Sequence, residues 1–340
     1  MNRFFIATIL LILMGGFAKV QDENISKTTS IFSIEPRFSA VGKFSEKLAP
    51  VSIKNAFGYI DTAGNIVITP LFEEALPFSE GLAAVRVNGK WGFIDGKGAL
   101  VIGYQYELVR DFSEGLAAVK LDGKWGFVDK KGRLVIKTMY NDVSPMKSGL
   151  APFKLGEKCG FLNKRGGIVI KASYETACSF SEGLACVEKK SLFGFVTPSG
   201  TLAIKPIYDD ALSFSEGLAA VSVKGKWGYV NKSGKMVIKP AFGLAENFSE
   251  GLAVVLIGDY FGYINNLGKT VIEAQYDYAE RMSEGLAPVK IGDKWGFIDA
   301  KGHMVIDPLF DDAYCFSDGM APVKLKKKWG FITHPFKNDR

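Results

Sequence analysis

Apolar side chains recur at every second position in several short segments of this chain, and this is the period of a β-strand. Gly115–Leu121 shows the alternation, with Ala, Val and Leu on one side. Lys124–Asp129 continues it and places Trp125 and Phe127 on a single face. A third segment of the same kind is Leu134–Tyr140. These segments are predicted to be strands, and no stretch has the 3.6-residue period of a good helix.

The residues between these segments are those of tight turns. Asp122–Gly123 tolerates positive φ and therefore predicts a hairpin turn. Asp129 and Gly132 stand at the first and fourth positions of the next turn, which suits a type I turn that ends in a left-handed residue. The three strands are therefore predicted to form a meander.

The meander belongs to a unit that recurs every 34 residues. The unit opens on Phe, or on Met in two cases, at Phe44, Phe78, Phe112, Met146, Phe180, Phe214, Phe248, Met282 and Phe316. All five tryptophans share one later position, at Trp91, Trp125, Trp227, Trp295 and Trp329. The other four units have Phe57, Cys159, Phe193 and Phe261 there. Such a period predicts a repeat architecture.

Both faces of the predicted strands carry apolar side chains. A face in contact with water would carry more charge, so each unit is expected to pack between two others. The pair Ala117–Ala118 and the glycine after the tryptophan, Gly126, are interpreted as space left for rings of a neighbouring unit.

Two all-β arrangements fit nine units of three strands, 27 strands in all. The chain enters the repeat on a strand near Ile34–Phe38 and ends after Trp329–Thr333. It can form an open, twisted β-solenoid, or a closed propeller-like ring in which the first strand completes the last unit. The solenoid is favoured, because three strands are few for a propeller blade and nine blades exceed the usual four to eight.

The strongest motif surrounds the tryptophans and reads Lys90–Asp95, Lys124–Asp129, Lys226–Asn231 and Lys294–Asp299. A Phe-Ser-Glu-Gly-Leu-Ala box, with Met282 for Phe in the last case, precedes each. These residues resemble the bacterial WG-repeat (KWG-type) family over about residues 31–333. The structural motif residues are the five tryptophans and the glycines that follow them, Gly92, Gly126, Gly228, Gly296 and Gly330. The resemblance implies a β-rich repeat that binds something, with no established reaction.

The unit that contains Cys159 departs furthest from this pattern. It also has Met146 in place of the opening Phe and Lys147–Ser148 in place of Ser-Glu. The three phenylalanine replacements keep the packing role of the tryptophan, whereas a cysteine does not. This unit is interpreted as the weakest of the array.

The N-terminus has the features of a secretory signal peptide. Arg3 precedes an apolar run that ends near Ala18, shorter than the roughly 20 residues of a membrane span. Small residues precede the expected cleavage site, and an uncleaved anchor is the alternative. We predict a signal peptide at 1–18, a linker at 19–30, the repeat array at 31–333 and a tail at 334–340. The protein is expected in the periplasm, on the cell surface or secreted, with no transmembrane span after cleavage.

The net charge of +6 would fall to about +5 on removal of Arg3 with the signal peptide. A mildly basic protein suits an anionic partner such as a cell-wall polymer or lipid headgroups. Lys326–Lys328 is a dense basic block, but no nucleic-acid motif surrounds it, so nucleic acid is not an expected partner.

The chemistry-bearing residues do not form a recognisable site. The recurring carboxylates are interpreted as turn or ladder residues, because acid–base catalysis needs one pair in distinct environments. The two histidines, His303 and His334, have no partner at metal-ligand or triad spacing. The four cysteines show no metal spacing, and their disulfide state is left open: Cys159, Cys178, Cys186 and Cys315. No catalytic, cofactor or metal site is predicted, and the protein is not expected to be an enzyme.

Two functions fit these observations. The first is an exported binding scaffold for a protein or an anionic envelope polymer. Its repeated surface would present aligned lysines at Lys137, Lys171, Lys205 and Lys239. A solvated strand edge that resists aggregation is the slightly favoured interpretation of these lysines. The second function is that of a structural, envelope-associated protein without a dedicated ligand.

Overall fold

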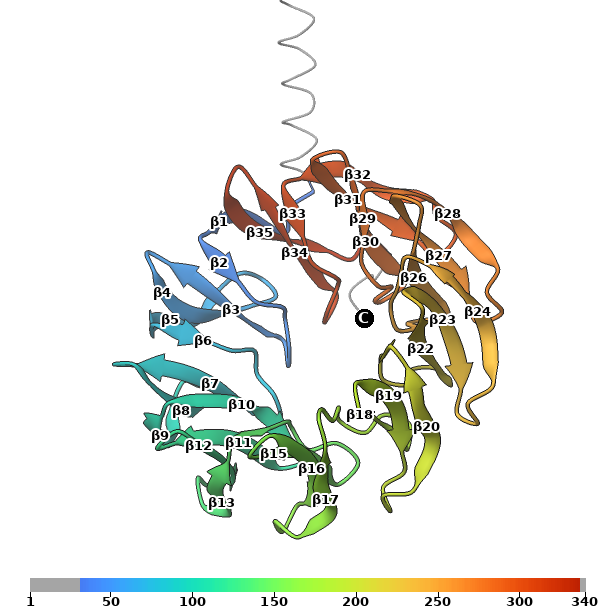
Figure 1. Cartoon of the computed structure of the whole chain (residues 1–340). Coiled ribbons are helices and arrows are strands. Elements are labelled where there is room, and N and C mark those ends of the chain that lie inside the picture. Colours follow the sequence, from blue (N-terminus) through green and yellow to red (C-terminus); the bar gives the residue numbers. More distant parts are fainter. Residues whose placement is uncertain (1–30, 337–340) are drawn as a thin grey trace, which may run out of the picture.

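The computed structural model describes residues 31–336, which form nine β-sheets arranged in a ring around one axis (Figure 1). Sheets that radiate from a common axis are the blades of a β-propeller. We number the blades in chain order, so that blade 1 contains β2–β5 and blade 9 contains β33–β35. No helix occurs in the described part of the chain. The predicted signal peptide and linker lie outside it.

Each blade is a meander whose strands follow one another from the axis outward. The innermost strands are β2 (Ala40–Val41), β6 (Glu74–Ala75), β10 (Leu108–Ser113), β14 (Asp142–Val143), β21 (Asp210–Ala211), β25 (Leu244–Ala245), β29 (Tyr278–Ala279) and β33 (Asp312–Ala313). The second strands are β3 (Leu48–Ile53), β7 (Leu82–Val87), β11 (Leu116–Leu121), β15 (Leu150–Leu155), β18 (Ala185–Lys189), β22 (Leu218–Val223), β26 (Leu252–Ile257), β30 (Leu286–Ile291) and β34 (Met320–Leu325).

The third strand of each blade contains the tryptophan position, and the outermost strand lies at the circumference of the ring. The third strands are β4 (Ala56–Asp61), β8 (Lys90–Asp95), β12 (Lys124–Asp129), β16 (Lys158–Asn163), β19 (Leu192–Val196), β23 (Lys226–Asn231), β27 (Tyr260–Asn265), β31 (Lys294–Asp299) and β35 (Lys328–Thr333). The outermost strands are β5 (Ile66–Phe72), β9 (Leu100–Tyr106), β13 (Leu134–Tyr140), β17 (Ile168–Tyr174), β20 (Leu202–Tyr208), β24 (Met236–Phe242), β28 (Thr270–Tyr276), β32 (Met304–Phe310) and β1 (Ile34–Phe38).

The alternation along the sequence predicts three of the four strands of a blade. β12 and β13 have the predicted bounds, and β11 begins one residue later than predicted. Asp122 and Gly123 have the predicted positive φ, 50° and 73°. The innermost strand is missing from the prediction because most of these strands are two residues long, too short to show a period. Blade 5 is three-stranded, with an isolated bridge between Ala177 and Val187 at the place of its innermost strand.

The two faces of each sheet pack against two different blades. In blade 3, Leu116 and Phe127 join a cluster with residues of blade 4, whereas Ala117 and Val119 join a cluster with residues of blade 2. Residues 31–336 contain nine such clusters, one at each contact between neighbouring blades. The expectation that each unit packs between two others is confirmed.

The favoured open solenoid is wrong, and the alternative, the closed ring, is the observed fold. β1 pairs antiparallel with β35 and so supplies the outermost strand of blade 9. In Figure 1 the blue β1 lies beside the red β35. Ile34 and Phe38 are buried in a cluster that joins blade 9 to Phe44 of blade 1. The strand count misled the prediction, because the undetected innermost strand brings most units to the four strands of a blade.

Closure predicts that the first strand contributes as much stability as an internal one. Phe38 of β1 and Phe310 of β32 occupy the same repeat position, and both are fully buried. We expect Phe38→Ala and Phe310→Ala each to lower the free energy of unfolding by about 3–5 kcal/mol, measured by urea denaturation. Phe336→Ala is the control, since this side chain is 68% exposed and should change little. A much smaller loss for Phe38→Ala would mean that β1 frays and the ring is open.

Candidate functional site

The Ser-Glu-Gly-Leu box forms a tight turn between the first and second strands of a blade. In blade 2 the Ser79 N–H donates to the Leu82 carbonyl at 2.9 Å. Glu80 and Gly81 have φ values of 54° and 85°, as a type I′ turn requires. A glutamate with positive φ is uncommon. Its side chain leaves the turn toward the next blade.

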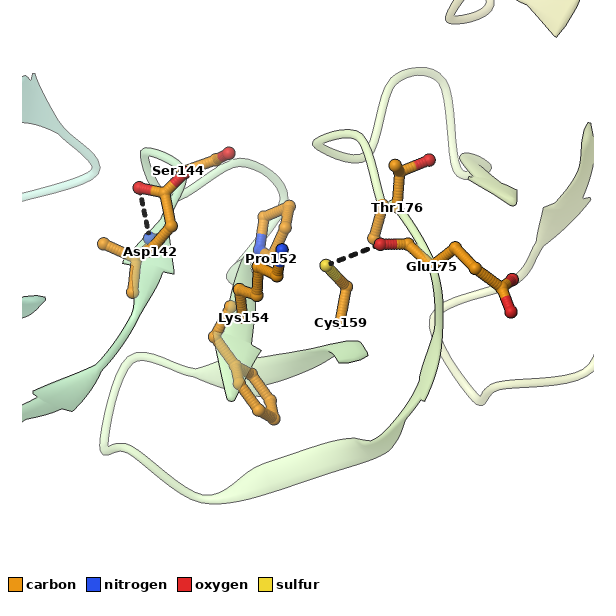
Figure 2. Close-up of a pocket in the computed structure, with 10 residues that line it drawn as sticks. Asp142, Ser144, Pro152, Lys154, Cys159, Glu175 and Thr176 are labelled. Carbon is orange, nitrogen blue, oxygen red and sulfur yellow. Dashed lines mark hydrogen bonds between the residues drawn. The ribbon is translucent and has the colours of Figure 1, made fainter. Parts of the chain in front are cut away.

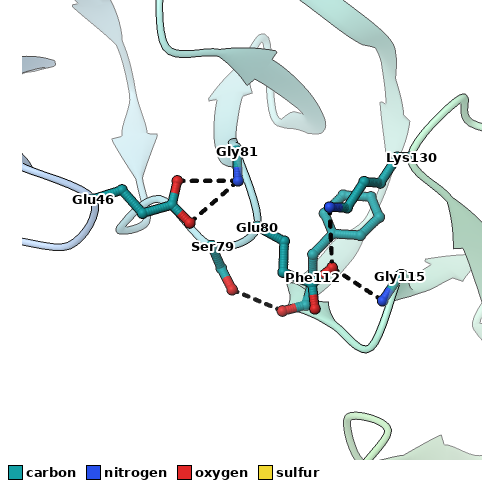
Figure 3. A network of polar contacts seen from close by, with 7 residues as sticks. All are labelled: Glu46, Ser79, Glu80, Gly81, Phe112, Gly115 and Lys130. Carbon is teal, nitrogen blue, oxygen red and sulfur yellow. Dashed lines mark hydrogen bonds and ion pairs between the residues drawn. The ribbon is translucent and has the colours of Figure 1, made fainter.

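These turns tie successive blades together on one face of the ring (Figure 3). The Ser79 hydroxyl donates to the Phe112 carbonyl at 2.8 Å, and the Glu80 carboxylate accepts the Gly115 N–H at 3.0 Å. Among the described residues, both ties occur at eight of the nine blade junctions. The serines are Ser45, Ser79, Ser113, Ser181, Ser215, Ser249, Ser283 and Ser317. The carboxylates are Glu46, Glu80, Glu114, Glu182, Glu216, Glu250, Glu284 and Asp318.

Lysines from the neighbouring blade strengthen three of these ties. Lys164 Nζ lies 3.0 Å from Glu114 Oε2, and Lys232 Nζ lies 3.0 Å from Glu182 Oε2. Partial burial acts to raise the pKa of both carboxyls, but the lysine ammonium and a glycine N–H outweigh it and hold each pKa below its usual value. Lys130 pairs with Glu80 in the same way. The repeated carboxylates therefore connect blades, as their interpretation as ladder residues predicts.

The tryptophan and glycine of the motif pack inside the ring. Trp91, Trp125 and Trp329 are buried, and Trp227 and Trp295 are half-buried. A side chain on Gly126 would place its Cβ 2.4 Å from the Ile136 carbonyl oxygen of the outermost strand of the same blade. A Cβ added to Gly92, Gly228, Gly296 or Gly330 would lie 2.5–2.6 Å from the equivalent carbonyl oxygen. The space was predicted to admit rings of a neighbouring unit; it instead admits backbone, because the outermost strand shifts register beside the tryptophan.

A cavity of about 230 Å³ lies between blades 4 and 5, beside Cys159 (Figure 2). Its walls include Asp142, Lys154 and Phe153 from blade 4 and Glu175–Ala177 from the segment that enters blade 5. The Cys159 thiol donates a hydrogen bond to the Glu175 carbonyl at 3.4 Å. Burial raises the pKa of this thiol, which keeps it protonated at neutral pH. The sequence marked Cys159 as a departure, but not the cavity beside it.

The same junction lacks the ties that join the other blades. Lys147 stands in place of the serine and has no hydroxyl, and Ser148 stands in place of the glutamate and has no carboxylate. That this unit is the weakest stays a prediction, and the two missing ties are a physical reason for it.

The outer rim presents apolar and basic side chains together. Lys137, Lys171, Lys205 and Lys239 are exposed on the outermost strands of blades 3–6. The outermost strands of blades 1–4 each begin with two exposed aliphatic residues, the rim pairs Ile66–Val67, Leu100–Val101, Leu134–Val135 and Ile168–Val169. Sequence reasoning found the lysines and missed these pairs, although two successive apolar residues at the start of the third predicted strand were visible.

The histidines and cysteines, which are the remaining candidates for catalysis or metal binding, show no such site in the described part of the chain. His334 is buried, and its Nε2–H donates to the Glu284 carbonyl at 2.7 Å. His303 Nδ1 is exposed and lies 3.0 Å from Asp299 Oδ2. All four cysteines are free thiols, and the buried Cys186 thiol donates to the Ala211 carbonyl at 3.5 Å. Within residues 31–336, no three His, Cys, Asp or Glu side chains gather as a metal site, and no helix is long and apolar enough to cross a membrane.

Comparison with known proteins identifies the repeat. The family described as WG containing repeat matches nine segments, residues 32–55, 57–91, 91–125, 125–159, 160–192, 193–227, 227–260, 261–295 and 295–329. The chain belongs to the WG-containing repeat family. The predicted family is thus confirmed, and no curated protein matches this WG-repeat chain.

Solved structures resemble this WG-repeat protein to different degrees. A structure described as the eukaryotic initiation factor has a TM-score of 0.62 at 11% identity, covering 89% of this chain and 92% of its own. Dihydro-heme d1 dehydrogenase NirN has a TM-score of 0.48 at 13% identity, covering 80% and 74%. PorZ of Porphyromonas gingivalis has a TM-score of 0.36 at 9% identity, covering 88% and 45%. The first of these supports the fold alone, and the other two support no conclusion about this chain.

The depressed carboxyl pKa values predict a specific loss of stability in acid. For Glu114 and Glu182 the folded pKa lies below the ordinary value of 4.5, so the unfolded chain takes up protons first as the pH falls. The stability that these groups contribute is present above about pH 4.5 and is lost as the pH falls through the folded pKa values. In a Glu114→Gln, Glu182→Gln double variant, the melting temperature should be lower at pH 7 and change less between pH 6 and pH 3.

The control for this experiment is Glu157→Gln, because the Glu157 side chain is 93% exposed and joins no blades. It should reproduce the acid sensitivity of the unaltered protein. Identical pH profiles for the double variant and the control would contradict the assignment of Glu114 and Glu182 as ties.

Proposed function

We propose that this WG-repeat protein is an exported, non-enzymatic scaffold that binds a protein partner through its outer rim. The observation that carries the proposal is the set of rim pairs. Their first residues, Ile66, Leu100, Leu134 and Ile168, are 50–54% exposed on four successive blades. Single exposed aliphatic residues are normal, whereas a repeated apolar surface edged by charge is typical of an interaction site.

The chemistry of the rim favours a protein with an apolar and acidic surface. Aliphatic side chains gain most from burial against other apolar side chains. The four lysines lie on the same kind of strand and would attract carboxylates of a partner, while also keeping the free strand edge from aggregating. An anionic envelope polymer is the second candidate, and the four aligned lysines are the observation that favours it. A structural role without a ligand is the remaining alternative.

Substitution of rim-pair residues by serine should abolish binding of the partner protein. The variant Leu100→Ser, Leu134→Ser, Ile168→Ser changes three exposed residues and should leave the fold intact. In a pull-down from envelope fractions, we expect a protein that is retained by the unaltered chain to be lost with this triple variant. Leu267→Ser is the matched control, because Leu267 is 80% exposed in the turn before β28 of blade 7, a blade without a rim pair, and its change should leave capture unaltered.

Other outcomes of this pull-down distinguish the alternatives. Loss of binding with Lys137→Glu, Lys171→Glu, Lys205→Glu but not with the rim variant would favour the anionic polymer. Equal capture by all variants would exclude the rim as the binding surface. Failure to retain any component would favour the structural role.

Export is a separate prediction, based on Arg3 and the apolar run that follows it. The mature protein should begin near Lys19, as shown by N-terminal sequencing of the native protein. An Arg3→Glu change, which reverses the charge before the apolar run, is expected to slow processing. Soluble cytoplasmic protein with an intact Met1 would contradict export.

A further inference from the structure

We infer that the cavity between blades 4 and 5 is a binding site for a planar, uncharged aromatic group. At this site the repeat lacks the aromatic side chain that the other units have. Eight of the nine units have Trp or Phe where this unit has Cys159. Replacing a large buried side chain with a small one leaves a cavity when the surroundings do not collapse. In Figure 2 the Cys159 side chain lies between the walls contributed by the two blades.

The walls of the cavity correspond to the surroundings of a tryptophan elsewhere in the ring. One unit earlier, Trp125 shares a cluster with Val143 of the following blade and with Tyr140 of its own outermost strand. The residues one repeat later are Ala177, which lines the cavity, and Tyr174. The cavity is therefore the counterpart of the Trp125 position, with Ala177 in the place of Val143.

Other units show what an aromatic ring would contact in this site. The Lys324 ammonium lies 5.4 Å from the Trp329 ring centroid, and Tyr314 stacks on the same ring at 4.9 Å. Lys154 and Ser144 occupy the positions of Lys324 and Tyr314, and both line the cavity. Lys154 can therefore make a cation–π contact with a bound ring, and Ser144 leaves the stacking position open. The Cys159 sulfur would add a favourable contact with the ring.

The charges around the cavity favour an uncharged ligand. The Asp142 carboxylate lies 3.1 Å from the Arg110 guanidinium. The Glu175 carboxylate lies 2.7 Å from Lys158 Nζ and also accepts the Lys190 N–H. Since both carboxylates already have cationic partners or N–H donors, neither is left to bind an organic cation. The Lys154 ammonium lies 3.5 Å from Glu157 Oε2, so it is not left to bind an anion either.

The size and the access of the cavity suit a bicyclic ring. An engineered apolar cavity of about 150 Å³ holds benzene, and this cavity, at about 230 Å³, is larger. The Lys154 and Glu175 side chains on its wall are 39% and 34% exposed, so a ligand can reach it from solvent. A bound ring would also join two blades whose serine and glutamate ties are missing. Binding to the folded state alone raises stability.

Indole titration of the full chain tests this inference. Millimolar indole should raise the melting temperature of the unaltered protein by a few degrees, and saturation-transfer NMR should detect indole bound to it. Cys159→Phe fills the cavity with a ring that three other units already have at this position. This variant should melt higher than the unaltered protein and should not respond to indole. Cyclohexanol, which is apolar but not aromatic, should have a much weaker effect on the unaltered protein.

Trp125→Cys is the positive control, because it opens the equivalent position between blades 3 and 4. It should lower the melting temperature, and indole should recover part of the loss. The inference is overturned if the unaltered protein fails to bind indole, if Cys159→Phe responds as the unaltered protein does, or if cyclohexanol is as effective as indole. Should Cys159→Phe not fold, protection of the Cys159 thiol from iodoacetamide by indole decides the question, and absence of protection overturns the site.

A second ligand distinguishes the two possible sources of the aromatic group, a partner protein and a small molecule. Binding of the tripeptide Gly-Trp-Gly at lower concentration than indole would indicate a tryptophan side chain of a partner protein. Binding of indole alone would indicate a small aromatic molecule. The site does not depend on the rim, so the variant Leu100→Ser, Leu134→Ser, Ile168→Ser should keep its full response to indole even where it loses its protein partner.

Discussion

Each blade of this protein has two apolar faces, and the fold depends on covering both. A single unit cannot hide both faces from water, and an open stack would leave one face bare at each end. Ring closure removes the two ends at once. The residues that close it, Ile34 and Phe38, are as buried as their counterparts in internal blades. The nine apolar clusters therefore form an unbroken circuit, and the N-terminal strand of the described chain belongs to the last blade because that blade lacks an outermost strand of its own.

The sequence predicts the local structure of this ring better than its closure. Strands such as β12 and β13 could be predicted to the residue, because alternation and turn residues act over a few positions. Closure could not, because the curvature of the array depends on the angle between neighbouring blades, which no short segment encodes. The two-residue innermost strands, such as Asp142–Val143, made the error larger. Without them a unit looked too small for a blade, and the solenoid was favoured.

For the candidate sites, too, the sequence predicts the role of a residue but not its partners in a neighbouring blade. Repetition was sufficient to interpret Glu114 as a ladder residue, but its partners Gly149 and Lys164 come from the next blade and could not be identified from spacing. Cys159 was visible as a departure from the repeat. That it leaves a cavity depends on Ala177, Ser144 and Lys154, three positions of two blades that only the fold brings together.

The junction that lacks the serine and carboxylate ties is not the one where the chain closes. At the closing junction the Ser317 hydroxyl donates to the Phe44 carbonyl, and the Asp318 carboxylate accepts the Lys47 N–H. Blades 9 and 1 are held by these contacts, by β1 and by their apolar cluster, since they are far apart in the sequence. Blades 4 and 5 are consecutive, so a short connection already holds them close, and bringing them together costs little loop entropy. Loss of the serine, glutamate and tryptophan is therefore best tolerated at a junction of this kind. A repeat protein that must keep its ring closed can lose individual side chains at such a junction, and a ligand can occupy the space that they leave.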